Sequence, residues 1–252
     1  ILKQYWGYDN FRPLQEDIIN AVLDGKDSLA MLPTGGGKSI CFQVPALAKD
    51  GLCLVVSPLI ALIKDQVENL KQKGILALAI YSGMDFLEIK KTLQNAAYGN
   101  YKFLYVSPER LETKLFLEFL PIIKINLIAV DEAHCISQWG YDFRPAYLRI
   151  ATLRELLPDV PVLALTASAT KIVQDDICSK LATQPLGSGV QKVKWEKFQQ
   201  SFERKNLSYS VFNVASKQKK LLEILKNVPG TAIVYCKSRK NCKEIADLLL
   251  LN

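Results

Sequence analysis

The sequence predicts an α/β fold, a parallel sheet covered on both faces by helices, followed by the start of a second series of the same kind. Short, almost continuously apolar runs alternate with segments whose apolar residues recur at helical spacing. Strands that are apolar throughout are typical of sheets buried on both faces. The composition agrees, since 49% hydrophobic and 23% charged residues in a chain of 252 are ordinary values for a protein with a large core.

The expected elements follow in order from the first residue. The N-terminal 26 residues are expected to be helical, because LQEDIINAVLDG has helical spacing and Gly25 is a typical stop. Strands are then expected at 28–32, 52–57, 76–81, 102–107, 126–130 and 162–166, and helices at 38–48, 60–73, 85–97, 109–119, 146–156 and 170–181. Parallel sheets bind ligands at the carboxyl ends of their strands, so residues that directly follow a strand are the first candidates for a site.

The alternation stops between residues 183 and 206, where turn residues are followed by a basic amphipathic stretch. Beyond it a strand at 207–214, a helix at 216–227, a strand at 231–235 and a helix at 238–250 are expected. The sequence therefore predicts a first domain over 1–182, a linker over 183–206 and part of a second domain over 207–252. Two strand–helix units are too few for a covered sheet.

The net charge of +7 is unevenly distributed. Residues 1–170 carry 17 basic and 18 acidic side chains, whereas residues 171–252 carry 15 basic and 7 acidic ones. This excess of positive charge favours a polyanionic partner, although a solvated lysine-rich surface fits the counts equally well.

The six cysteines include no C-x-x-C pair, and the only histidine is His134. The sequence therefore predicts free thiols in a reducing cytoplasm and no zinc site. No apolar run approaches the ~20 residues of a membrane-spanning helix.

A glycine-rich loop follows the first expected strand, in LAMLPTGGGKSICFQVPAL. Its glycines can turn their N–H groups inward, and a helix beginning at Lys38 adds its positive end to the same concavity. Lys38 is suited to the outer phosphates of a nucleotide and Ser39 to its Mg²⁺. Leu32 departs from the general pattern, which has glycine or alanine there, and an ordinary βα turn is the alternative. The candidate cofactor-binding residues of this loop are Thr34, Gly35, Gly36, Gly37, Lys38 and Ser39.

Asp131 and Glu132 follow the apolar run NLIAV. Asp131 can hold an Mg²⁺ shared with Ser39, and Glu132 can orient and deprotonate an attacking water. Adjacent carboxylates are usually a solvated turn, but an earlier phosphate loop that also follows a strand favours the catalytic interpretation. The candidate catalytic residues are thus Lys38, Asp131 and Glu132. His134 is expected to link this loop to a neighbouring strand end by hydrogen bonds.

Further candidates stand after other strands. Ser57 and Ser107, with Arg110, lie at strand-to-helix junctions, whose N–H groups are suited to phosphates, although each junction is equally well explained as a capping turn. The segment 136–147 is rich in aromatic residues, and its Gly140, Asp142 and Pro145 predict a loop rather than a core element. An aromatic loop beside an ATPase carboxylate is well placed to stack DNA bases. Its candidate residues are Trp139, Phe143 and Arg144.

These motifs together resemble the N-terminal part of a RecQ-family DNA helicase, a superfamily two enzyme. In order they are GYDNFRPLQ, LPTGGGKS, VSPLIALIKDQ, VSPERL, DEAH, CISQWGYDFRPAY, LTASAT and TAIVYCKSR. DEAH followed at once by CISQWGYDFRP is the most specific of them. Leu32 is typical of this family's loop, whereas Tyr141 stands where many members have histidine.

The resemblance implies a RecA-like ATP-binding domain and the start of a second RecA-like domain. It implies that Tyr8, Arg12 and Gln15 form the adenine pocket, and a glutamine amide can indeed pair with adenine. An exposed position for Gln15 on the first helix is the alternative. Ser168 and Thr170, in LTASAT, match the family's coupling motif, where their hydroxyls can bridge to the DEAH loop, but helix capping is a common alternative for such residues.

By the same resemblance the expected cofactors are ATP and Mg²⁺, and the partners are single-stranded and partly duplex DNA. The implied activity is 3′-to-5′ unwinding in DNA repair or recombination. The family's arginine finger, zinc-binding module and winged helix are expected beyond Asn252, so the chain by itself is expected to hydrolyse ATP slowly and to unwind nothing. The alternatives are an RNA-directed superfamily two helicase and a nucleic-acid-binding module with a structural nucleotide site.

Overall fold

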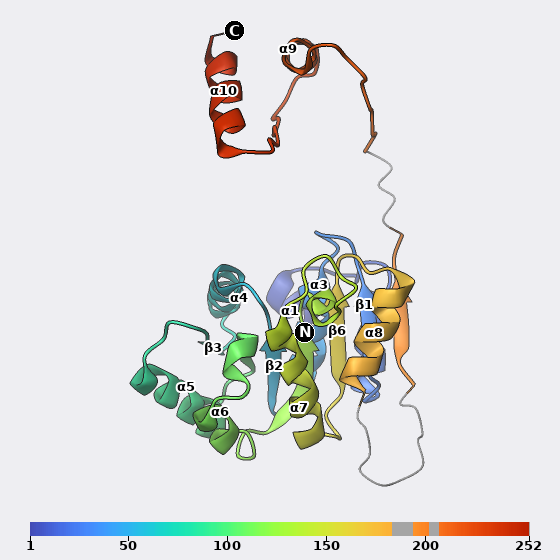
Figure 1. Cartoon of the computed structure of the whole chain (residues 1–252). Helices are drawn as coiled ribbons and strands as arrows, with labels where there is room; N and C mark the ends of the chain where they lie inside the picture. The colour runs from blue at the N-terminus through green and yellow to red at the C-terminus, as the bar shows by residue number, and fades with distance from the viewer. Residues whose placement is uncertain (183–193, 202–206, 252) are drawn as a thin grey trace. The chain divides into compact units, whose positions relative to one another are not determined.

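The structure is a computed structural model that describes residues 1–182, 194–201 and 207–251 (Figure 1). The chain forms two compact units, Ile1–Phe202 and Glu203–Asn252. Within the described residues, no helix is both long and apolar enough to cross a membrane.

The first unit is built on a seven-stranded sheet whose pairings are all parallel. The strand order is β3-β4-β2-β5-β6-β1-β7. The strands are β1 (Ser28–Met31), β2 (Leu52–Val56), β3 (Ala77–Ile80), β4 (Phe103–Val106), β5 (Ile125–Val130), β6 (Val162–Thr166) and β7 (Glu196–Gln199). The six strands expected in the first domain are confirmed to within a residue or two.

Helices connect these strands and cover the sheet. They are α1 (Leu2–Trp6), α2 (Gln15–Leu23), α3 (Lys38–Ala48), α4 (Ile60–Gln72), α5 (Phe86–Tyr98), α6 (Lys114–Phe119), α7 (Arg149–Leu156) and α8 (Lys171–Leu181), with 3₁₀ turns η1 (Pro108–Arg110), η2 (Ala133–Ile136) and η3 (Pro145–Leu148). The helix expected at 109–119 is therefore wrong in detail, because a 3₁₀ turn and a separate short helix occupy that range.

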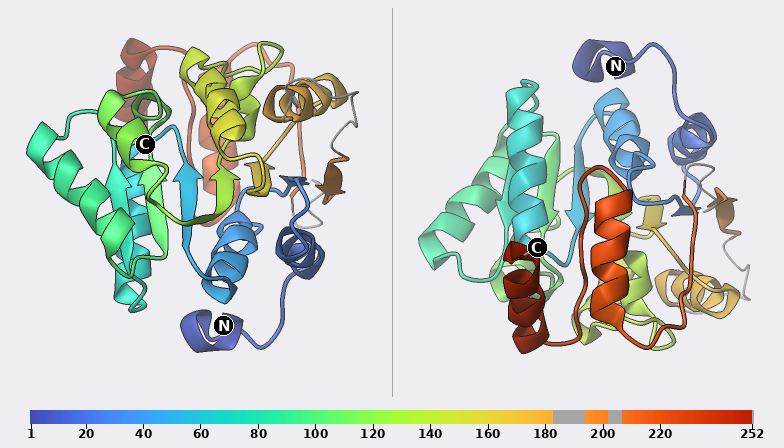
Figure 2. Two further views of the ribbon diagram at one scale, coloured as in Figure 1. Left: turned by 90° about the horizontal axis from the view of Figure 1, so that it is seen from below. Right: turned by 90° about the horizontal axis from the view of Figure 1, so that it is seen from above.

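Alternate strand residues face opposite sides of the sheet. Leu52, Leu54 and Val56 of β2 pack in one core cluster with residues of α5 to α8, whereas Cys53 and Val55 pack in another with residues of α2 to α4. Figure 2 shows these two groups of helices on opposite faces of the sheet. Strands β1, β2, β4 and β6 are buried on both faces along their whole length, which explains their continuous apolar sequences.

The carboxyl ends of the strands lie along one edge of the sheet. The pairing of neighbouring strands continues by one residue beyond the strand ends. Backbone hydrogen bonds run there from Leu32 N to Thr166 O, from Asp131 N to Val56 O and from Ser57 N to Val106 O. The glycine-rich loop and the DEAH residues therefore emerge at the same edge, on β1 and β5, which β6 separates.

The N-terminal region is not one helix as expected. α1 ends at Gly7, whose φ is +73°, and α2 begins only at Gln15. Between them Pro13 is followed by Leu14 in a left-handed conformation, with φ of +66°. Proline disfavours a helical conformation in the residue before it, so the chain forms a loop here.

The expected linker over 183–206 is partly wrong. Residues 183–193 and 202–206 lie outside the described residues, but Glu196–Gln199 form β7, which pairs in parallel with β1. Residues of alternating exposure in this strand are consistent with its place at the edge of the sheet. A sequence with little apolar character can form an edge strand because only one neighbour and one face need to be satisfied.

The second unit contains α9 (Lys217–Asn227) and α10 (Arg239–Leu250) as expected, but the strands expected at 207–214 and 231–235 do not form. Their apolar side chains are exposed; Val211 is 97% and Tyr235 is 91% accessible. A strand needs a hydrogen-bonding partner, and within residues 207–251 these two segments do not pair.

Candidate nucleotide and nucleic-acid site

The glycine-rich loop joins the end of β1 to the start of α3. Gly35 and Gly37 have φ of +79° and +81°, a region that side chains with a Cβ rarely adopt. A Cβ on Gly37 would also lie 2.4 Å from Nε2 of Gln15. Glycine is therefore required at position 37 both for its backbone conformation and for the space beside it.

Two side chains from the N-terminal region brace this loop. Gln15 donates from Nε2 to the carbonyl of Gly37 at 3.0 Å and accepts at Oε1 from the backbone N–H of Arg12. The guanidinium of Arg12 donates to the carbonyl of Gly35. Gln15 is 3% exposed, so the alternative that it lies on a solvent-facing surface is wrong.

A cavity of about 740 Å³ lies in front of the loop. We call it the nucleotide cavity; among its lining residues are Tyr8, Arg12, Gln15, Gly37, Lys38 and Ser39. Thr34 and Gly36 belong to the same loop. Nζ of Lys38 lies 3.4 Å from the carbonyl of Leu32, so the ammonium is folded back over the loop. The sequence motifs GYDNFRPLQ and LPTGGGKS, which are separate in the chain, thus form one cavity.

The DEAH carboxylates lie just beyond β5. Burial and the neighbouring charge of Glu132 raise the pKa of Asp131 to about 6, while the N–H of Glu132, the ammonium of Lys38 and the hydroxyl of Ser57 act to lower it. Carboxylate and hydroxyl oxygens are ligands that Mg²⁺ prefers, and a cation would offset the charge that makes Asp131 hard to ionise. Asp131 and Ser39 therefore suit Mg²⁺ chemically.

Glu132 has a φ of +47°, which is unusual for a residue with a side chain. Its carboxylate lies 3.4 Å from Nδ1 of His134. Non-glycine residues in this conformation are concentrated at functional sites, because surrounding contacts must hold them there.

His134 links the DEAH residues to β6, as the sequence predicted. Nδ1 of His134 lies 2.9 Å from the hydroxyl of Thr166, the last residue of β6, and burial lowers the histidine's pKa. The hydroxyl that contacts His134 is thus that of Thr166, and a bridge from Ser168 stays a prediction. Thr170 instead caps α8 by accepting from the N–H of Val173. Thr166 was missed because a threonine at a strand end is common and carries no special signal.

The segment 136–147, which we call the aromatic loop, is a loop as expected. Trp139 and Tyr141 are 71% and 78% exposed. The ammonium of Lys180 lies 5.8 Å from the ring of Phe143. Tyr147, however, belongs to the core and donates its hydroxyl to the backbone carbonyl of Asp131 at 2.8 Å. The loop is thus anchored directly behind the DEAH carboxylate.

Arg144 ties the aromatic loop to a third strand end. Its guanidinium donates to the carbonyl of Pro58, which follows β2, at 3.1 Å and to the carboxylate of Asp142 at 3.0 Å. The side chains of Ser57 and Ser107 are 2% exposed, and Arg110 donates to the carbonyl of Tyr81. A ligand at these strand ends would therefore meet loop backbone rather than the two serine hydroxyls.

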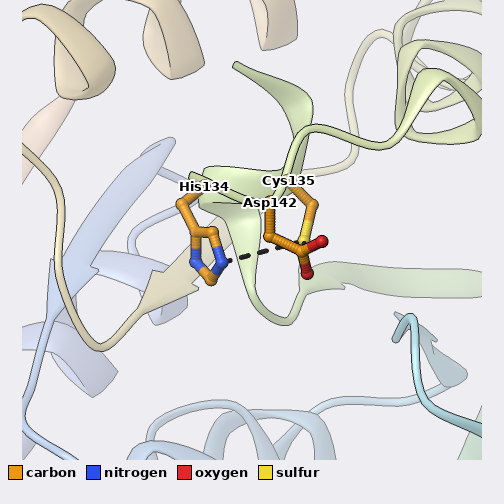
Figure 3. Close-up of side chains that lie close together, drawn as sticks. All are labelled: His134, Cys135 and Asp142. Carbon is orange, nitrogen blue, oxygen red and sulfur yellow. Dashed lines mark hydrogen bonds between the residues drawn. The ribbon is translucent and has the colours of Figure 1, made fainter. Parts of the chain in front are cut away.

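One further group of side chains was missed from the sequence. His134, Cys135 and Asp142 place a ring nitrogen, a thiol and a carboxylate within 4.8 Å of one another (Figure 3). Cys135 is fully buried, and burial together with Asp142 raises its pKa to about 12. No spacing rule for metal ligands detects this group, because the loop must first fold back over η2.

Comparison with known proteins places these motifs in a family. The pattern of the DEAD/DEAH box helicase family matches residues 12–176. The chain is 42% identical over 251 residues to the ATP-dependent DNA helicase RecQ of Haemophilus influenzae, covering 99% of this chain and 39% of that protein. It is 43% identical over 249 residues to the probable ATP-dependent DNA helicase RecS of Bacillus subtilis, covering 97% and 48%.

A relative named for RNA is equally similar. The putative ATP-dependent RNA helicase of Acanthamoeba polyphaga mimivirus is 41% identical over 260 residues, covering 100% of this chain and 45% of that protein. The chain therefore spans less than half the length of these three relatives.

Solved structures agree on the fold. The DUF1998 helicase MrfA aligns with a TM-score of 0.68 at 18% identity, over 97% of this chain and 39% of that one. The helicase domain of Pyrococcus furiosus Hef aligns with a TM-score of 0.54 at 23% identity, over 74% and 38%. The predicted RecA-like fold is thereby confirmed for the first unit. Because the family pattern covers well over half of the chain, the protein belongs to the DEAD/DEAH box helicases, and its identity to RecQ and RecS over nearly its whole length confirms the predicted resemblance to the RecQ family.

Proposed function

We propose that this chain is the ATP-binding part of a RecQ-type, ATP-dependent DNA helicase that couples Mg²⁺-ATP hydrolysis to 3′-to-5′ strand separation in DNA repair or recombination, in the cytoplasm. Its ATP-binding domain is the first unit, Ile1–Phe202, which extends past the expected boundary at 182 because β7 joins its sheet, and 207–252 begins a second RecA-like domain. The main support is that the phosphate loop and the DEAH carboxylates, on β1 and β5, lie at one edge of the sheet. At this edge the positive charge of Lys38 acts to lower the pKa of Asp131.

The nucleotide cavity fits this proposal. The exposed ring of Tyr8 is available to stack on adenine. Lys38 would leave the Leu32 carbonyl for the outer phosphates, Ser39 and Asp131 would hold Mg²⁺, and Glu132 would orient the attacking water. Both ends of the Gln15 amide are engaged in this structure, so reading adenine requires Gln15 to exchange a bond to the loop for one to the base.

DNA would lie along the same strand ends. Trp139 and Tyr141 offer exposed aromatic surface for stacking, which binds unpaired bases regardless of sequence. Arg144 connects that loop to the carbonyl of Pro58 beside Ser57. A bound DNA strand that moves the aromatic loop would therefore also move Tyr147, whose hydroxyl is bonded to the backbone carbonyl of Asp131.

Nucleotide turnover with matched strands tests the proposal. The complete protein is expected to hydrolyse ATP faster with single-stranded DNA than with RNA of the same sequence and length. Equal or greater stimulation by RNA would support the RNA-directed alternative, which the viral relative's name keeps open. ATP binding with no turnover on either strand would support the binding module and contradict the proposal.

A further inference from the structure

Three potential metal ligands meet where the aromatic loop returns to the DEAH residues. Nε2 of His134 lies 3.8 Å from Sγ of Cys135, and Sγ lies 3.7 Å from Oδ2 of Asp142. In Figure 3 the imidazole edge and the carboxylate both approach the sulfur. We propose that this cluster binds a thiophilic divalent cation such as Zn²⁺, at a site separate from the Mg²⁺ ligands Ser39 and Asp131.

The spacing of the ligand atoms fits a tetrahedral ion. With zinc–sulfur bonds of about 2.3 Å and zinc–nitrogen or zinc–oxygen bonds of about 2.0–2.2 Å, the sulfur in a tetrahedral site lies about 3.5 Å from each other ligand. The two observed separations, 3.8 and 3.7 Å, exceed this value by a few tenths of an ångström. The third pair, a ring nitrogen of His134 and a carboxylate oxygen of Asp142, lies within 4.8 Å, so closing the site requires a rotation of the Asp142 or His134 side chain that brings these two atoms together.

The cluster has more acceptor atoms than protons. With the hydroxyl of Thr166 directed to the carbonyl of Ser168 at 3.2 Å, we assign the ring proton of His134 to Nδ1, where the oxygen of Thr166 and the carboxylate of Glu132 can accept it. The neutral ring then presents the lone pair of Nε2 to Cys135. The single S–H proton of Cys135 faces two acceptors, Nε2 and the carboxylate of Asp142. A cation in place of this proton would satisfy all three atoms.

The surroundings already have the form of a metal site. Histidine ligands are commonly oriented by a carboxylate or a hydroxyl at their other nitrogen, and here Glu132 and Thr166 lie at Nδ1. Tyr141 stacks on the face of the ring, 4.7 Å between centroids, and so leaves the in-plane approach to Nε2 open. The side chain of Asp142 is 44% exposed, and water can supply a fourth ligand.

Arg144 competes with the cation. Its guanidinium binds Oδ2 of Asp142 through Nε at 3.2 Å and through one terminal nitrogen at 3.0 Å. On binding, a metal–sulfur bond forms, the S–H bond breaks and its proton passes to solvent. The ion also draws Asp142 away from Arg144. Occupancy would therefore break a contact within the aromatic loop and leave the guanidinium of Arg144 bound only to the carbonyl of Pro58.

Titration with Co²⁺, a spectroscopic substitute for Zn²⁺, tests the site in the 252-residue chain. Cys236 and Cys242 lie within hydrogen-bonding reach of one another, so both are first changed to Ser to remove a competing pair. In this parent we expect one Co²⁺ per chain, with a thiolate-to-cobalt charge-transfer band. Zn²⁺ should displace the ion and an excess of Mg²⁺ should not, because Mg²⁺ prefers oxygen ligands.

Single substitutions in this parent test the contribution of each proposed ligand residue. Cys135→Ser should lose the band, Asp142→Asn should weaken binding at least tenfold, and the matched control Cys178→Ser should change neither. Arg144→Ala should bind Co²⁺ several-fold more tightly, because Asp142 is then released. The half-exposed Asp142 variant tests the ligand set even if Cys135→Ser fails to fold. The proposal would be overturned if the parent shows no charge-transfer band or if the band survives Cys135→Ser. It would also be overturned if the affinity for Co²⁺ is unchanged in Arg144→Ala.

Discussion

The nucleotide cavity and the aromatic loop lie at the same edge of the sheet, but their side chains are held in different ways. Around the cavity, Arg12 and Gln15 donate to backbone carbonyls of the glycine-rich loop. The aromatic loop is instead held by a series of side-chain contacts that joins β6, the DEAH residues and the end of β2 through His134, Cys135 and Arg144. The backbone of the glycine-rich loop is thus braced directly, whereas the aromatic loop is held by contacts between side chains.

Under the proposed function, this difference would separate nucleotide binding from the coupling of nucleotide hydrolysis to DNA. Substitutions in the cavity should alter the affinity for nucleotide or the rate of ATP hydrolysis whether or not DNA is present. Changes in the aromatic loop should spare nucleotide binding and alter the response to DNA. The predictions below test this separation, from the largest expected effect to the smallest.

Lys38→Ala should lower ATP hydrolysis by about a hundredfold or more, because the positive charge that would neutralise the transferring phosphate is lost. The measurement is steady-state turnover of the complete protein, with and without DNA. Lys26→Ala is the matched control, since Lys26 is an exposed partner of Asp24 outside the cavity lining. Near-normal turnover in Lys38→Ala would show that the loop is not a phosphate cradle.

Trp139→Ala should weaken binding of single-stranded DNA by about tenfold, since stacking of one base contributes roughly 1–3 kcal/mol. Stimulation of ATP hydrolysis by DNA should fall with it, while affinity for ATP stays unchanged. Arg144→Ala should also reduce stimulation, because the loop loses its bond to Pro58. Tyr98→Ala, an exposed aromatic residue on α5, is the control. Equal stimulation of variant and parent would remove the aromatic loop from the coupling path.

Gln15→Ala should reduce the preference for ATP over GTP by several-fold, because neutral hydrogen bonds contribute about 1 kcal/mol each. Competition between the two nucleotides measures this preference directly. If affinity for both nucleotides falls equally, Gln15 acts only by bracing the loop at Gly37 and does not read the base.

Asp131→Asn should raise the stability of the metal-free protein at pH 8. The pKa of Asp131 is raised in the folded state to about 6 from 3.8, so the folded protein binds more protons than the unfolded chain between these values. Stability therefore decreases as the pH rises through this window, and the charged carboxylate is unfavourable above it. Asn removes that cost, which is about 1–2 kcal/mol for a partly solvated group.

Thermal melts at pH 8 and below pH 4 provide the measurement. The higher Tm of Asp131→Asn should be present at pH 8 and largely absent at the acidic pH. With Mg²⁺-ATP the order should reverse at pH 8, because the parent alone keeps its carboxylate ligand. A Tm difference that does not depend on pH would contradict the raised pKa.

Much of the first unit was predictable because its signals are local. Six strands are apolar on both faces, and the glycine-rich loop must have residues without a Cβ at the positive φ of Gly35 and Gly37. Such constraints act on neighbouring residues and are visible in the sequence. β7 escaped prediction since an edge strand has little apolar pattern, and the strands expected in the second unit failed because a strand also needs a partner.

The sequence by itself determined six of the seven strands of the first unit, the places of the glycine-rich loop and the DEAH carboxylates after two of them, and the resemblance to RecQ helicases. Only the tertiary structure decided which side chains meet. It pairs His134 with Thr166, buries Tyr147 while leaving Trp139 exposed, and brings Asp142 to Cys135. These contacts depend on the strand order of the sheet and on the return of one loop over η2, and neither is encoded in the spacing of residues along the chain.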